Sequence, residues 1–139
     1  MARESTKGVL SKKNPYYIPK YRYYELKYRC LQYNDWAVQY YDLGLCLNAM
    51  NISNDKVDDP NVYDPVSDAV LKRSLLGVKM KAIDNALKAI ELNLREPIKN
   101  AVTTGAGWQV IQARYSLICT REEYYNAYHK FFWVLDKSV

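Results

Sequence analysis

Apolar residues recur along much of this chain at steps of three and four, the spacing that places them on one face of an α-helix. The first such stripe follows Pro19 and consists of Tyr23, Leu26, Cys30 and Tyr33. Proline is tolerated at a first helical position because its missing N–H would have no partner within the helix. The pattern therefore predicts a first helix that begins near Pro19.

A second helix is predicted from Trp36 to about Met50, with Asn34–Asp35 as its cap. Its stripe consists of Trp36, Tyr40, Leu43 and Leu47. The break before it would make an antiparallel helical pair of the first two helices. Residues 51–64 are rich in asparagine and aspartate and include Pro60, a composition typical of turns, so we expect a surface loop there.

The longest predicted helix begins at Asp64–Pro65 and continues for about eight turns. Its apolar stripe consists of Val70, Leu71, Leu75, Val78, Ile83, Leu87, Ile90 and Leu94. We expect this helix to end by Glu96, because a proline disfavours helical geometry in the residue before it.

Residues 97–139 predict two short helices and a longer one, joined by tight turns. Pro97 opens the first, which Thr103–Thr104–Gly105 ends, and the second runs from Trp108 to Ala113. Thr120 to Glu123 has the form of a capping box for the third, Arg121 to Leu135. This arrangement is typical of a helix-turn-helix, and the predicted fold is all-α: a helical pair, a long central helix and this carboxyl-terminal three-helix module.

The third helix of this module divides into two faces. Tyr124, Tyr128, Phe131, Phe132 and Leu135 form the inward stripe, which leaves Arg121, Glu122, Tyr125, Asn126, His129 and Lys130 opposite. In a helix-turn-helix the amino-terminal half of the last helix reaches base edges in the major groove. Asn126 is suited to adenine, Arg121 to guanine or phosphate, and Tyr125 to stacking or phosphate contact. The alternative is that these residues, with Thr120, form only the solvated face of a terminal helix.

Several strings of this chain resemble small proteins of phages and prophages of Gram-positive bacteria related to the RinA/ArpU type of late-operon transcriptional regulators. The strings are residues 23–33 followed by Trp36, residues 101–105, Tyr124–Tyr125 and residues 130–135, and the resemblance covers about residues 15 to 136. It implies a helical front, and a carboxyl-terminal helix-turn-helix similar to the last DNA-binding region of sigma factors. Residues 108–113 would then be the supporting helix and residues 121–135 the recognition helix. This chain departs from the family in one respect. The family has a more basic stretch just before the Phe131–Phe132 pair, where this chain has Asn126 to Lys130, and Glu122 and Glu123 lie near the expected DNA.

The net positive charge of the chain favours a polyanionic partner but does not require one. The 139-residue chain carries a net charge of +5, and eight of its basic residues fall within the first 29 positions against only Glu4 and Glu25. We expect residues 1–14 to be a flexible basic arm, followed by a helical region over 15–96 and the module over 97–139, together forming one compact unit. Lys12, Lys13, Lys20 and Arg22 would contact the DNA backbone. A solvated arm is the simpler alternative.

Motifs for catalysis and metal binding are missing from the sequence. His129 is the only histidine and the three cysteines have no C-x-x-C spacing, so no zinc site is expected. The acidic residues 55–64 lack the glycine and the terminal glutamate of a calcium loop, and no nucleophile motif or phosphate-cradling loop occurs. We therefore expect no enzyme and no cofactor. With no signal peptide and no membrane span, we expect a cytoplasmic protein with buried, reduced cysteines.

The favoured interpretation is a phage or prophage regulator that binds promoter or operator DNA, contacts host RNA polymerase and acts as a homodimer. Fourteen tyrosines support another class, a phage assembly or host-takeover module that uses a tyrosine-rich helical surface against a protein. A small-terminase-like packaging factor is the third possibility.

Overall fold

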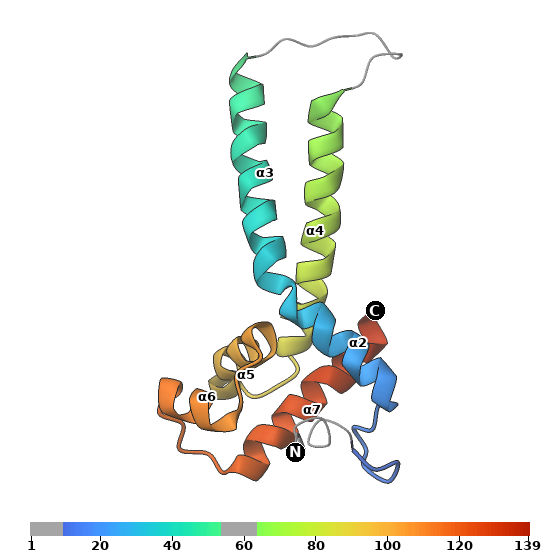
Figure 1. Ribbon diagram of the computed structural model, residues 1–139, viewed down its shortest axis with the longest axis vertical. Coiled ribbons are helices and arrows are strands. Elements are labelled where there is room, and N and C mark those ends of the chain that lie inside the picture. The colour runs from blue at the N-terminus through green and yellow to red at the C-terminus, as the bar shows by residue number, and fades with distance from the viewer. Residues whose placement is uncertain (1–9, 54–63) are drawn as a thin grey trace. The chain divides into compact units, whose positions relative to one another are not determined.

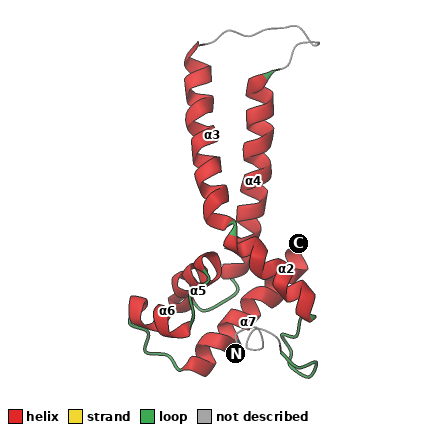
Figure 2. Ribbon diagram, viewed as in Figure 1, coloured by secondary structure: helices red, strands yellow, loops and turns green. Residues whose placement is uncertain are grey.

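A computed structural model of the protein describes residues 10–53 and 64–139. Within those ranges the chain is all-α, as predicted, and contains no strand (Figures 1 and 2). The helices are α2 (Lys20–Leu31), α3 (Tyr33–Ser53), α4 (Pro65–Leu87), α5 (Leu92–Thr104), α6 (Trp108–Tyr115) and α7 (Arg121–Ser138). Among the described residues no helix is long and apolar enough to cross a membrane.

The chain divides into two compact units. The first unit consists of Met1–Tyr33 and Ala82–Val139, and the second of Asn34–Lys81. The first unit therefore contains α2, α5, α6, α7 and the last turns of α4, whereas the second is built from α3 and α4. The boundary expected between residues 96 and 97 falls inside α5.

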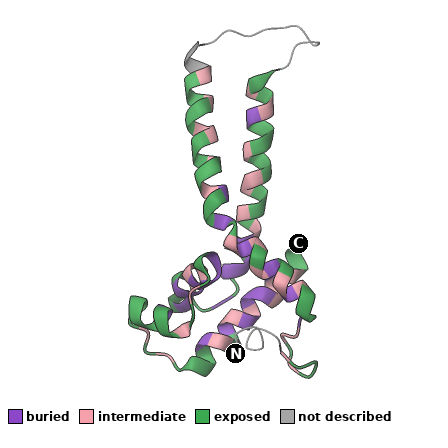
Figure 3. Cartoon of the chain, viewed as in Figure 1, coloured by how far each residue is buried: buried purple, intermediate pink, exposed green. Residues whose placement is uncertain are grey.

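The first unit holds nearly all of the buried side chains, as Figure 3 shows. α2 packs against α5 and α7, and α5 also contacts α6. The stripe predicted for the first helix is confirmed, because Tyr23, Leu26, Cys30 and Tyr33 are all buried. The inward stripe of the last helix is also confirmed: Tyr124, Phe131, Phe132 and Leu135 are buried and Tyr128 is half-buried.

The predicted boundaries of the second helix are wrong. α3 begins at Tyr33, so Asn34–Asp35 lie within the helix, and it continues to Ser53, three residues into the expected loop. Only Gln32 separates α2 from α3, and its backbone stays in the right-handed helical region. With no glycine or proline here, the local sequence does not stop a helix. Residues 54–63 of the expected loop lie outside the described residues.

The predicted end of the longest helix is also wrong. α4 stops at Leu87 instead of Glu96, and Pro97 lies inside α5. Arg95 stabilises the intervening turn: its Nε donates to the carbonyl of Ile90 at 3.1 Å and its Nη2 to that of Lys88 at 3.0 Å. Pro97 cannot donate a backbone hydrogen bond, but its ring is buried in the core, and this burial offsets the loss.

The second unit is an antiparallel pair of helices, α3 and α4. Trp36 is buried at one end, and half-buried Tyr40, Leu43 and Leu47 follow it along α3, as predicted. The predicted stripe of α4 is confirmed at Ile83 and Leu87, which are buried in the first unit. It is wrong for the first part of the helix, where Val70, Leu71, Leu75 and Val78 are between 51% and 66% exposed. α4 carries apolar residues on two faces, so periodicity alone did not decide which one would be covered.

Arg73 explains which face of α4 turns toward α3. Its Nε donates to the carbonyl of Tyr40 at 3.1 Å, and its guanidinium lies 3.9 Å from the centre of the Tyr40 ring. Gly44 leaves room for this side chain, since a Cβ there would lie 2.9 Å from Arg73 Nη2. A planar cation stacked on an aromatic ring is a favourable contact, so Arg73 occupies the face between the helices.

We expect Phe131→Ala to destabilise the first unit by about 3–5 kcal/mol, because the fully buried ring would leave a cavity in the core. Urea unfolding followed by circular dichroism measures this loss. Tyr21→Ala is the matched control: Tyr21 is 76% exposed, and its removal should change the free energy of unfolding by less than about 0.5 kcal/mol. Equal losses for the two variants would contradict the assigned core.

Candidate nucleic-acid interface

α5, α6 and α7 are the three helices predicted for the carboxyl end. α5 ends at Gly105, whose φ of +79° is the left-handed conformation that glycine adopts without strain, and its N–H donates to the Ala101 carbonyl. α6 follows from Trp108 and ends at Tyr115, two residues later than expected. α5 contacts both α6 and α7, so it supports the two helices of the motif.

The start of α7 is held by a side-chain cap and by a ring contact. The Thr120 hydroxyl accepts a hydrogen bond from the backbone N–H of Glu123 at 3.1 Å, which is one half of the predicted capping box. The rings of Trp108 and Tyr124 lie 4.9 Å apart and connect α6 with the first turn of α7. The amino-terminal end of α7 is therefore well positioned relative to α6.

The outer face of α7 carries most of the residues expected there. Arg121, Glu122 and Asn126 are exposed, and Tyr125 and Lys130 are half-buried. The Arg121 guanidinium lies 5.5 Å from the Tyr125 ring centre, so these two side chains form one surface. Thr120 is exposed as well, although its hydroxyl already serves as the cap.

His129 does not belong to this face, which corrects the sequence-based assignment. Only 9% of the residue is exposed, and its ring lies against those of Tyr128 and Tyr125 at 5.5 and 6.0 Å. Burial lowers its pKa from 6.5 to about 4, so the imidazole is neutral at physiological pH. Aromatic residues extend around α7 beyond the five inward positions, and they cover the place where the histidine was expected to meet solvent.

The amino-terminal cations differ in their surroundings. Lys12, Lys13 and Lys20 are exposed, and the first two lie in a turn in which the Asn14 N–H donates to the Ser11 carbonyl at 3.0 Å. Residues 1–9 of the expected arm lie outside the described residues.

Arg22 makes contacts within the protein. Its Nε lies 2.6 Å from Asp136 Oδ1, and its Nη2 donates to the Val139 carbonyl at 2.6 Å. These contacts join α2 to the end of α7. Arg22 is thus part of the frame that holds α7, a role that the sequence analysis missed because its partners are 114 and 117 residues away.

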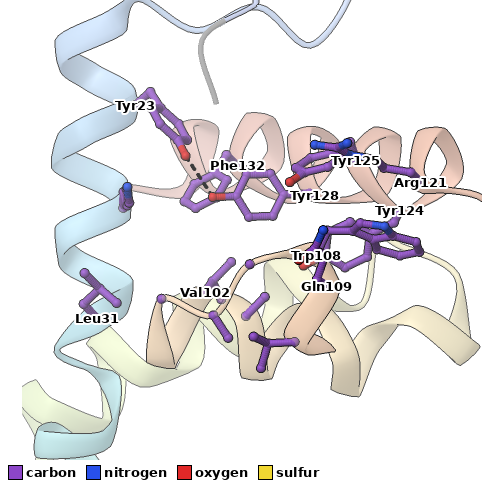
Figure 4. Close-up of a pocket in the computed structure, with 16 residues that line it drawn as sticks. Tyr23, Leu31, Val102, Trp108, Gln109, Arg121, Tyr124, Tyr125, Tyr128 and Phe132 are labelled. Atoms are coloured by element: carbon purple, nitrogen blue, oxygen red, sulfur yellow. Dashed lines mark hydrogen bonds between the residues drawn. The ribbon is translucent and has the colours of Figure 1, made fainter. Parts of the chain in front are cut away.

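An aromatic pocket adjoins the outer face of α7, and sequence reasoning did not find it. It has a volume of about 440 Å³ and lies between α2, α7 and the junction of α5 with α6 (Figure 4). The hydroxyl groups of Tyr23 and Tyr128 lie 2.8 Å apart at its wall. The sequence places both tyrosines on inward stripes, but only the packing of the helices reveals that a space remains between them.

Three tyrosines at this pocket keep their protons at physiological pH. Burial raises the pKa of Tyr23, Tyr124 and Tyr128, so their hydroxyl groups act only as hydrogen-bonding groups. Burial also raises the pKa of Cys30 to about 12. Cys46, in contrast, is exposed, which corrects the expectation that all the cysteines are buried.

The described residues contain no group of histidine, cysteine, aspartate or glutamate side chains arranged to hold a metal ion. Comparison with protein-family models, with curated proteins and with solved structures gives no match. The arguments for function therefore rest on the geometry of this chain.

His129 provides a direct test of the packing around α7. Since it is the only histidine, its ring protons are assigned without ambiguity in an NMR titration, and we expect a midpoint near pH 4. The unfolded chain binds the proton more tightly, so stability falls as the pH drops from about 6.5 to 4. The loss between about pH 7 and pH 5 is on the order of 2 kcal/mol. His129→Gln should remove this pH dependence, whereas a midpoint near 6.5 would contradict the burial.

Proposed function

We propose that the protein is a non-enzymatic DNA-binding regulator that inserts α7 into the major groove. The observation that supports this most is the exposure of Arg121, Glu122 and Asn126 on the first turns of α7, directly after the turn of a helix-turn-helix. These are the positions from which the second helix of such a motif reads base edges. Asn126 matches the donor and acceptor of adenine, and Arg121 matches the two acceptors of guanine.

The shape of the module is consistent with this use. The 18 residues of α7 extend about 27 Å at 1.5 Å per residue, and a major groove admits an α-helix. The aromatic side of α7 is covered by α2 and α5, so its polar side remains free to approach DNA. The two glutamates of the first turn, Glu122 and Glu123, complement the helix dipole but repel phosphate, which favours base contacts over backbone contacts at this end.

Backbone contacts would come from elsewhere on the chain. Lys12, Lys13 and Lys20 are exposed cations, and the net charge of +5 favours association with a polyanion. By its resemblance to late-operon regulators, the protein would act in a phage or prophage on a promoter or operator, as a homodimer and in contact with host RNA polymerase.

The DNA-binding role is tested by replacing Arg121 and Asn126 together with alanine. A randomised duplex library defines the sequence that the unaltered protein prefers. Fluorescence anisotropy then measures the affinity of each protein variant for this duplex and for an unrelated duplex, at two salt concentrations. We expect the double variant to lose the preference, since each base contact contributes about 1–3 kcal/mol of discrimination. Helicity should be unchanged, because both side chains are exposed.

Lys137→Ala is the matched control, because it removes one positive charge from the same helix about 24 Å from Arg121. It should retain the sequence preference. Preference that survives in the Arg121/Asn126 variant would refute the assignment of α7 as the recognition helix. Binding with neither preference nor salt dependence would refute the regulator itself and favour the protein-interaction module.

A further inference from the structure

The aromatic pocket of the first unit has the composition of a site for a flat ligand. Six rings line it, and they come from three helices: Tyr23, Trp108, Tyr124, Tyr125, Tyr128 and Phe132. A volume of about 440 Å³ falls in the range of small-ligand sites. In Figure 4 the rings of Tyr125 and Tyr128 line one side of the pocket, and Trp108 and Gln109 of α6 lie on the other, with the Tyr124 ring against Trp108.

Two cations at the pocket point to a negatively charged ligand. Lys27 lines it from α2 and Arg121 from α7, and no carboxylate of the described residues forms an ion pair with either. α6 also begins at the pocket, and its amino-terminal cap, Gly107, provides no side-chain hydrogen bond. The first N–H groups of a helix carry partial positive charge and commonly bind anions.

Polar groups suited to a heterocycle are present beside the rings. Gln109 lines the pocket and offers both a donor and an acceptor. Tyr124, another lining residue, is 1% exposed, and its hydroxyl has no hydrogen-bond partner among the described residues. This hydroxyl is itself buried, so Gln109 is the neutral polar side chain that a ligand in the pocket would meet.

We propose that this pocket binds a free nucleoside monophosphate, with the base against the rings of α6 and α7 and the phosphate on Lys27. Base–aromatic stacking accepts any base, whereas the lysine requires the phosphate. This site shares Arg121 and Tyr125 with the proposed DNA contact, but Lys27, Trp108 and Gln109 belong to the pocket alone.

Isothermal titration calorimetry with the full-length protein tests the proposal without any duplex DNA. We expect AMP to bind with one site per chain, adenosine to bind at least tenfold more weakly, and inorganic phosphate to bind at least tenfold more weakly than AMP. Equal affinity for AMP and inorganic phosphate would overturn the role of the rings, and no binding of AMP, GMP, CMP or UMP would overturn the site. If single-stranded oligodeoxyadenylate bound more than tenfold tighter than AMP, the ligand of the pocket would be a nucleic-acid strand and not a free nucleotide.

Two variants and one control variant locate the binding. Lys27→Gln should weaken AMP about tenfold, whereas Lys20→Gln, on the same helix but outside the pocket, should leave the affinity unchanged. Gly107→Leu should weaken AMP, because Gly107 lines the pocket and a larger side chain there takes up space at its rim. The fold should tolerate the change, since a Cβ at Gly107 meets no atom within 4 Å and its φ of −82° suits any residue. Circular dichroism confirms folding of each variant. Undiminished AMP affinity in folded Gly107→Leu, or equal losses in the two lysine variants, would refute the site.

Discussion

The contact between α2 and α7 is the interaction on which the rest of the first unit depends. Tyr23 packs edge-on against Phe132, with ring centres 5.1 Å apart, and its hydroxyl lies 2.8 Å from that of Tyr128. The ion pair of Arg22 with Asp136 also joins these two helices. This contact connects segments more than one hundred residues apart, and since α5 packs against both helices, α7 is fixed along its aromatic side. The polar side and the amino-terminal end of α7 are left uncovered, which is what a groove-reading helix requires.

α7 carries more aromatic side chains than one buried stripe needs, and this excess has two consequences. The rings of Tyr125 and Tyr128 lie against His129, which is buried and neutral. The outer face of α7 therefore has one polar residue fewer than its sequence suggests. Tyr125 and Tyr128 also border, together with Trp108, a space that no side chain fills. The pocket and the candidate DNA surface therefore share α7, and Arg121 and Tyr125 belong to both.

The second unit is organised by a different kind of contact. Its two helices meet through Arg73 on Tyr40, Lys79 on Trp36 and the close approach at Gly44, while few apolar side chains are buried. Cation–ring contacts of this kind contribute about 0.5–2 kcal/mol each, less than a fully buried aliphatic side chain. The unit consequently has a much smaller apolar core than the first, and the outer face of α4 retains Leu71, Leu75 and Val78 in solvent.

Local signals in the sequence determined the all-helical class, the buried stripe of α2, the inward residues of α7, the turn at Gly105 and the cap at Thr120. Each of these depends on residues within one or two turns, where propensity, periodicity and capping are decisive. The end of α4 depends on the hydrogen bonds of Arg95, which are local but match no simple motif, whereas contacts distant in sequence decided the place of Pro97 inside α5 and the face that α4 turns to α3. They also buried His129 and left the aromatic pocket open. The physical reason is that burial depends on which surfaces meet, and a helix with apolar or aromatic residues on more than one face does not specify its partner.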